Sequence, residues 1–303
     1  MIYNRRKILL ALIEALEEDL TAIQVQKYLF LYTREQQDKS YDFIPYYYGC
    51  FSFQANQDLM TLSKLGYLTM VEQQESNKTV SVIRINKKEN YKALLDIFEQ
   101  DTLQRVVTKY KNLSQEELIR YTYIHYPYYA TKSVIAKDIL TSDELARIEK
   151  QKRKFETPIL CTIGYEGISL ETYINKLIIN DIRILCDVRK NAYSQKYGFS
   201  KSQLEKACKG IGIQYVHIPQ LGINSEQRQN LRSQRDYDIL FDLYEKTTLQ
   251  ENVDALLYIR GLIEQDKRIA LTCFEANPKQ CHRSRVAKHL MLFPNIDYEL
   301  KHL

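Results

Sequence analysis

The sequence predicts an α/β domain with a mostly parallel sheet, preceded by a mainly helical, winged-helix-like domain. Two observations support this fold class. In the first half, three segments with apolar residues at helical spacing precede two strand-like segments. From residue 157 onward, short apolar strands alternate with helices, which is typical of a parallel sheet covered on both faces. A chain of 303 residues is long enough for two domains, which we expect at 1–155 and 156–303.

Helices open the N-terminal domain. Ile8, Leu12 and Leu16 recur at helical spacing, Thr21 is placed to cap the next helix, and Gly66 ends the third. Three helices followed by a β-hairpin is the order of a winged helix, a class that binds DNA or docks proteins. The expected elements are helices over 4–18, 22–32 and 54–65, a loop over 41–53, strands over 67–71 and 79–85, and further helices over 89–150.

Charge is unevenly distributed along the chain. The net charge is +5, but residues 1–150 carry 20 basic and 20 acidic side chains, so the excess lies in residues 151–303. Such an excess is compatible with a polyanionic or phosphorylated partner, and equally with an ordinary, mildly basic domain. The third helix has Lys64 as its single basic residue, which weakens a base-reading role for it.

Strands and helices alternate through the C-terminal domain. Ser169 and Ser200 are placed to cap the helices after the first and second strands, and helix-compatible residues follow Cys281. In a parallel sheet of this kind, ligands bind beyond the carboxyl ends of the strands. The expected strands are 158–163, 182–186, 214–218, 268–273 and 298–303.

Charged side chains stand at or just after four of these strand ends, namely Glu166, Asp187, Arg189, His217 and Glu275. Each also has a structural interpretation. A carboxylate can cap the next turn, Arg189 can pair with Asp187, and His217 can be satisfied at its strand end. Because one topology gathers residues that are far apart in the sequence, we favour a shared pocket.

The stretch 268–290 combines a buried strand, a polar loop and the start of a helix. Unpaired N–H groups at a helix start favour an anion and a cysteine thiolate. Cys273, Cys281 and His282 lack a fourth ligand at the usual zinc spacing, so we predict no metal site. The predicted catalytic residues are Glu166, Asp187, Glu275 and Cys281, and the predicted anion- or substrate-binding residues are Arg189, Ser194, His282 and Arg283.

Cysteine usage and hydropathy bear on location. Three of the six cysteines sit in or beside apolar strand-like runs, which indicates reduced thiols and not a disulfide framework. No apolar run is long enough to cross a bilayer, and the N-terminal segment reads as an amphipathic helix and not as a signal peptide. We therefore expect a cytoplasmic protein without a membrane partner.

Short sequence motifs in the C-terminal half resemble those of the bacterial domain of unknown function 488, over residues 158–303. They are TIGYEG at 162–167, DVR at 187–189, Ser194, Tyr215, LG at 221–222, CFE at 273–275 and CHR at 281–283. The resemblance implies the α/β fold and the site, but no settled reaction. Where this family commonly has a proline after Asp-Val-Arg, this chain has Asn191 and Ala192, which leaves the shape of that loop open.

Words in the N-terminal half resemble YwgA-like bacterial domains, distantly similar to the Panacea domains of toxin–antitoxin systems, over residues 3–135. They are QKYLFLY at 26–32, FIPYYYG at 43–49, FS at 51–52, DL at 58–59 and LGYL at 65–68. This resemblance implies a recognition or regulatory module and no known catalysis.

The leading functional hypothesis is an enzyme of bacterial defence or stress that cleaves glycosidic or phosphodiester bonds in nucleic acid or nucleotides. Its N-terminal domain would recognise the substrate or a protein partner. The alternative is a non-catalytic DNA-binding or antitoxin-like regulator with a ligand-sensing α/β domain. A third hypothesis is a thiol-dependent transferase that uses Cys281. No cofactor is identified, and the absence of a Walker loop and of G-x-G-x-x-G argues against a nucleotide-driven motor or a dinucleotide dehydrogenase.

Overall fold

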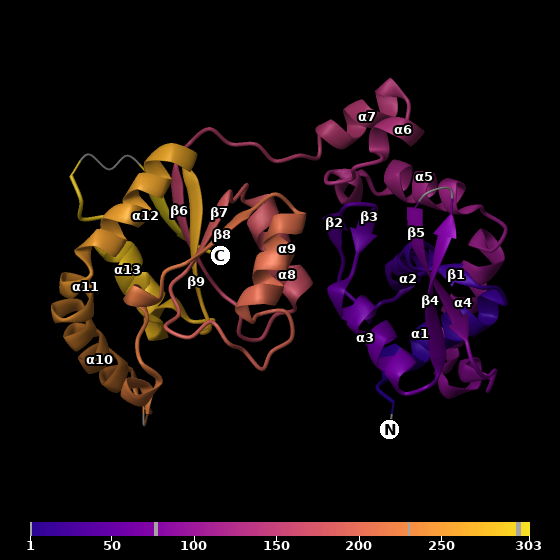
Figure 1. Ribbon diagram of the computed structural model, residues 1–303, viewed down its shortest axis with the longest axis horizontal. Coiled ribbons are helices and arrows are strands. Elements are labelled where there is room, and N and C mark those ends of the chain that lie inside the picture. The colour runs from indigo at the N-terminus through magenta and orange to yellow at the C-terminus, as the bar shows by residue number, and fades with distance from the viewer. Residues whose placement is uncertain (1, 76–77, 230, 295–297) are drawn as a thin grey trace. The chain divides into compact units, whose positions relative to one another are not determined.

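The computed structural model of the chain describes residues 2–75, 78–229, 231–294 and 298–303. The chain forms two compact units, residues 1–152 and 153–303 (Figure 1). The first unit is mainly helical, and the second is an α/β unit with a five-stranded parallel sheet, so the predicted fold class is confirmed. Within the described part of the chain, no helix is both long enough and apolar enough to span a bilayer.

Side-chain caps start several helices of the N-terminal unit. Thr21 and Gln24 form a capping box at the start of α2, and Ser114 and Glu117 form the same motif at α5. Each box satisfies N–H groups that have no partner within the helix. The helices are α1 (Asn4–Leu16), α2 (Ala22–Glu35), α3 (Phe53–Lys64), α4 (Ile97–Tyr110), α5 (Gln115–His125), α6 (Ala136–Ile139) and α7 (Ser142–Glu149), with short 3-10 turns η1 (Tyr91–Leu94) and η2 (Pro127–Ala130).

A three-stranded antiparallel sheet completes the first part of this unit. Its order is β1-β5-β4, formed by β1 (Leu20–Thr21), β4 (Leu68–Glu75) and β5 (Lys78–Ile85). The hairpin of β4 and β5 contains the two strands that the sequence predicts. Strand β1 lies between α1 and α2 in the chain, and its pairing with β5 ties these helices to the hairpin.

Residues 41–53 were expected to form a loop, and this expectation is wrong for part of the segment. Strand β2 (Ile44–Tyr46) pairs antiparallel with β3 (Gly49–Phe51). Gly49 has a φ of 94°, a conformation that L side chains rarely adopt, and it permits the tight turn between the two strands. Pro45 does not prevent this pairing, because both strands of a two-stranded ribbon are edge strands, where proline is tolerated.

A buried carboxylate links α3 to α1. Asp58 on α3 is fully buried, and its oxygens accept hydrogen bonds from Arg5 Nε at 2.6 Å and Arg6 Nε at 2.7 Å. The Tyr41 hydroxyl donates to the same carboxylate at 3.1 Å. Both arginines near the N-terminus are therefore committed to a contact within this unit.

The sheet of the C-terminal unit has the strand order β10-β6-β9-β7-β8 and is parallel throughout. Strand β9 occupies the centre, and all six of its residues are buried. Asp187 lies opposite Thr272, and Gly164 lies opposite Cys273, so the carboxyl ends of the three central strands reach the same level. The strands are β6 (Ile159–Gly164), β7 (Ile184–Asp187), β8 (Gln214–His217), β9 (Arg268–Cys273) and β10 (Glu299–His302).

Helices cover both faces of this sheet. Figure 1 shows α8 and α9 on one side and α12 and α13 on the other. Phe241, Ile259 and Val286 pack with Leu271 of the central strand in one apolar core. The helices are α8 (Leu170–Ile179), α9 (Lys201–Gly210), α10 (Gln234–Lys246), α11 (Thr248–Glu251), α12 (Val253–Asp266) and α13 (His282–Leu290), with 3-10 turns η3 (Pro219–Leu221), η4 (Ser225–Arg228) and η5 (Pro278–Gln280).

Candidate functional site

A buried ion pair joins Asp187, the last residue of β7, to Arg189 in the following loop. Arg189 Nε lies 2.8 Å from Oδ1 and 3.0 Å from Oδ2, and the Tyr215 hydroxyl donates to Oδ2 over 2.6 Å. The guanidinium also donates to the Tyr165 hydroxyl and the Phe199 carbonyl. Burial alone would lower the pKa of Arg189, but its hydrogen bonds to Asp187 and the charge of that carboxylate raise it. The pair is thus satisfied inside the protein, and it holds the start of the loop after β7.

The loop at residues 274–276 is held from two sides. Arg283, which is 1% exposed, donates to the carbonyl oxygens of Glu275 and Ala276. On the other side, the exposed Glu166 accepts a hydrogen bond from Ala276 N at 2.9 Å. Gly164 allows this approach, because a Cβ there would lie 1.9 Å from the Glu275 carbonyl oxygen. Arg283 and Glu166 therefore fix the backbone that carries the Glu275 side chain.

The carboxylate of Glu275 has two different neighbours. Its Oε1 lies 2.6 Å from Arg228 NH2, and its Oε2 lies 3.3 Å from the Cys273 sulfur. Burial would raise the pKa of Glu275, but the charge of Arg228 and a hydrogen bond with Cys281 lower it below its ordinary value. Since 16% of the Glu275 side chain is exposed, this ionised carboxylate still reaches solvent.

Two thiols and an imidazole lie close together beside the carboxylate of Glu275. Cys273, Cys281 and His282 are all buried, and their ligand-type atoms lie within 4.8 Å of one another. His282 Nε2 is 2.8 Å from the Val188 carbonyl oxygen, and Nδ1 is 3.6 Å from the Cys273 sulfur. A carbonyl only accepts hydrogen bonds, so Nε2 carries a proton, and Nδ1 is the ring nitrogen beside the Cys273 sulfur. We call Cys273, Glu275, Cys281 and His282 the Cys–His–Glu cluster.

Cys281 occupies the N-cap position of α13, as the sequence suggests, but it is not an exposed thiolate. The residue is fully buried, and its side chain does not cap the helix. Burial raises the pKa of the Cys281 thiol well above its ordinary value, and a hydrogen bond with Cys273 raises it further. The thiol is therefore protonated at neutral pH, despite its place at a helix start.

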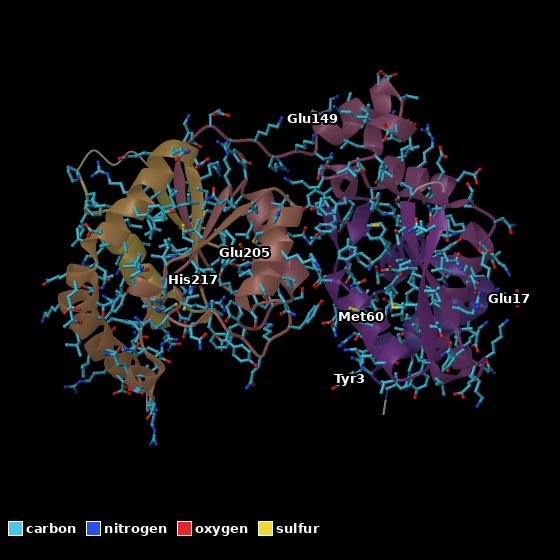
Figure 2. The ribbon with its side chains drawn as sticks, viewed as in Figure 1. Tyr3, Glu17, Met60, Glu149, Glu205 and His217 are labelled. Atoms are coloured by element: carbon cyan, nitrogen blue, oxygen red, sulfur yellow. The ribbon has the colours of Figure 1, made fainter. Side chains whose placement is uncertain are left out.

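Ser194 and His217 belong to a different part of the carboxyl edge. Ser194 Oγ accepts from Lys196 N at 3.1 Å within its own loop, and His217 Nε2 donates to the Arg189 carbonyl at 2.9 Å. His217 also lines an open pocket of about 530 Å³ together with Glu205 of α9, and both are labelled in Figure 2. That pocket is bounded by residues 190–193 and by the start of α9.

The predicted site residues therefore fall into separate groups. Glu275, Cys281 and His282 come together. Glu166, Arg189 and Arg283 hold loops, and His217 lines the pocket of about 530 Å³. Sequence reasoning missed Arg228, which lies in a polar stretch with no periodicity or motif to mark it. Cys273, the last residue of β9, is buried, and its sulfur lies 3.3 Å from Glu275 Oε2, so the Cys-x-Glu spacing at 273–275 brings both side chains together after one strand.

Comparison with known proteins supports the resemblance of the C-terminal half. Residues 169–290 match the family model described as "Domain of unknown function DUF488". The match runs from the residue that caps α8 to the last residue of α13, and it includes the whole Cys–His–Glu cluster. A comparison with curated proteins returned no match. The chain is thus similar to this family over those residues.

Proposed function

We propose that the C-terminal unit is the catalytic part of a hydrolase that cleaves glycosidic or phosphodiester bonds in nucleic acid or nucleotides. The environment of Glu275 is the observation that supports this proposal. Glu275 is an ionised, mostly buried carboxylate that still reaches solvent at the carboxyl edge of a parallel sheet, where α/β units bind ligands. Its side chain is fixed by Arg228 and its backbone by Arg283, so its geometry is preorganised.

In this proposal Glu275 accepts a proton from the attacking water, and Arg228 binds a phosphate oxygen of the substrate. Arginine suits this role because its planar guanidinium matches phosphate geometry. The basic excess of residues 151–303 supports an anionic substrate. A pocket of about 460 Å³, lined by Lys279, Arg285 and Lys288 among others, adds positive charge along the loop and helix that follow Glu275.

The N-terminal unit has the role of recognising a partner. The element order is α1, β1, α2, β2, β3, α3, β4, β5, with the sheet order β1-β5-β4. Apart from the β2–β3 hairpin between α2 and α3, it is the order of a winged helix, which supports a recognition module. Its charge favours a protein partner over DNA. In α3, Lys64 is the single basic residue, and Arg5 and Arg6 are bound to Asp58. We propose a cytoplasmic location, which the six free cysteines support because free thiols suit a reducing compartment.

The test uses the purified full chain with labelled DNA, RNA and nucleotides, and follows product formation. Glu275→Gln removes the proton acceptor and keeps the side-chain volume, so the rate should fall by about 10²–10⁴-fold. Glu264→Gln is the matched control, because Glu264 is an exposed helical carboxylate that also pairs with an arginine. Absence of any product from the wild type, or an unchanged rate in Glu275→Gln, would overturn the proposal.

A second candidate is a non-catalytic regulator with a ligand-sensing α/β unit. The observation that favours it is the burial of Asp187, Arg189 and Arg283, whose charges are used to hold loops. Salt-dependent DNA binding that maps to residues 1–135, without any turnover, would support this candidate against the hydrolase.

A further inference from the structure

We propose that the Cys–His–Glu cluster binds one zinc ion through the sulfurs of Cys273 and Cys281 and through His282 Nδ1, with Glu275 beside the ion as proton acceptor. The metal's catalytic part rests on the hydrolase proposed above, whereas metal binding itself does not. The three ligands lie between the end of the central strand β9 and the start of α13, so two rigid elements supply all of them.

The separations of the three ligand atoms are compatible with a tetrahedral zinc site. With a zinc–sulfur bond of about 2.3 Å and a zinc–nitrogen bond of about 2.0 Å, a tetrahedron places sulfur about 3.5 Å from nitrogen. Cys273 Sγ lies 3.6 Å from His282 Nδ1, in agreement with that edge. The Cys281 sulfur lies within 4.8 Å of the other sulfur and of Nδ1, which leaves a small inward movement on binding. Glu275 Oε2 lies 3.3 Å from the Cys273 sulfur, beside the three ligands.

The hydrogen bonds around the ligand atoms are those that a metal site needs. Histidine ligands usually donate their second N–H to a carbonyl or carboxylate, which fixes the ring and the tautomer. His282 does so through Nε2 to the Val188 carbonyl, so Nδ1 is the nitrogen left for the metal. The two oxygens of Glu275 also have different neighbours. Oε1 pairs with Arg228, and Oε2 lies beside the Cys273 sulfur.

The charges of a zinc-bound cluster would also balance. Zinc displaces one proton from each thiol, so Zn²⁺ and two Cys–SH groups give a neutral Zn(S–Cys)₂ unit and two released protons. The negative charge of Glu275 is matched by Arg228.

The ligand types select the metal. Two thiolates and an imidazole favour zinc and related transition metals over magnesium or calcium, which prefer oxygen ligands. Three protein ligands leave a fourth position for water, as in catalytic zinc sites. A bound zinc ion would lower the pKa of that water. Glu275, held by Arg228 and with Oε2 beside the cluster, would be placed to accept the proton.

The experiment measures zinc binding by the full chain after treatment with a chelator. The wild type should bind one Zn²⁺ per chain, and Cys273→Ala should lower the affinity by at least about 100-fold. Cys208→Ala is the matched control, because it removes another buried thiol from α9 and should bind as the wild type does. Circular dichroism of each variant shows whether it is folded. Failure of the wild type to bind zinc, or equal affinity in Cys273→Ala and Cys208→Ala, would overturn the proposal.

A second measurement needs no variant. Cobalt(II) in a tetrahedral site with thiolate ligands shows intense visible bands and a sulfur-to-metal charge-transfer band, and the wild type should show both. A weak spectrum without charge transfer would refute the ligand set. The two proposals fail separately. Zinc binding without hydrolysis of any substrate refutes the hydrolase and keeps the site, whereas hydrolysis that survives both metal removal and Cys273→Ala refutes the metal's role.

Discussion

Asp187→Ala should destabilise the C-terminal unit strongly, although the sequence suggested a catalytic role for this residue. The change removes a fully buried carboxylate and leaves the guanidinium of Arg189 buried without its ionic partner. Breaking one side of a buried pair typically costs about 3–5 kcal/mol of unfolding free energy. Arg189 keeps its hydrogen bonds to Tyr165 and Phe199, which places the cost near the lower end, at about 3 kcal/mol. For a unit of about 150 residues, this lowers Tm by about 6–12 °C.

Thermal unfolding followed by far-ultraviolet circular dichroism checks this value. Two compact units can unfold in two steps, so the comparison uses the transition that moves and not a single global midpoint. Asp242→Ala is the matched control, because Asp242 is an exposed carboxylate on α10 and its removal should change stability by less than about 0.5 kcal/mol. If Asp187→Ala unfolds within about 1 kcal/mol of that control, the pair does not hold the loop after β7, and Asp187 is available for chemistry.

Two further predictions concern glycines and cysteines. Gly164→Ala should displace the loop at 274–276 and lower Tm, because its Cβ would lie 1.9 Å from the Glu275 carbonyl, whereas Gly261→Ala in α12 meets nothing within 4 Å and should stabilise by about 0.5–1 kcal/mol. Equal Tm values for the two variants would refute this. Stability should also fall as pH rises above about 9, because burial raises the pKa of Cys161 to about 11 and of Cys186 to about 12. The unfolded thiols ionise first, so the unfolded state binds fewer protons in that range. Urea midpoints that stay constant between pH about 8 and 10 would contradict the argument.

Much of the fold was predictable because it depends on local patterns. The alternation of short apolar strands with helices identified the parallel sheet, and β-branched runs such as residues 268–273 became buried strands. Side-chain caps at Thr21 and Ser169 appeared where the sequence placed them, whereas the Ser200 side chain does not cap α9. The hairpin of β2 and β3 was missed because a proline outweighed the turn signal of Gly49.

The candidate site was less predictable, because it depends on which charges meet inside the fold. A sequence places Asp187, Arg189 and Glu275 at one edge of the sheet, but it does not show that the first two satisfy each other and leave the third with Arg228. Burial also reverses the expectation that Cys281 is a thiolate. A helix start favours a thiolate, yet removal from water favours the protonated thiol more strongly, and no local pattern reports that balance.

The opposing effects of burial and of the helix start decide how reactive the thiols of the Cys–His–Glu cluster are. A thiol that burial keeps protonated is a poor nucleophile, so the cluster is poorly suited to the thiol-dependent transferase. A divalent cation reverses the balance, since it favours the thiolate at the place where burial opposes it. The buried sulfurs and the imidazole then form one ligand set, with the Glu275 carboxylate beside it. On this argument, thiol chemistry at Cys281 without a metal should be slow, and the reactivity of this edge should follow metal content.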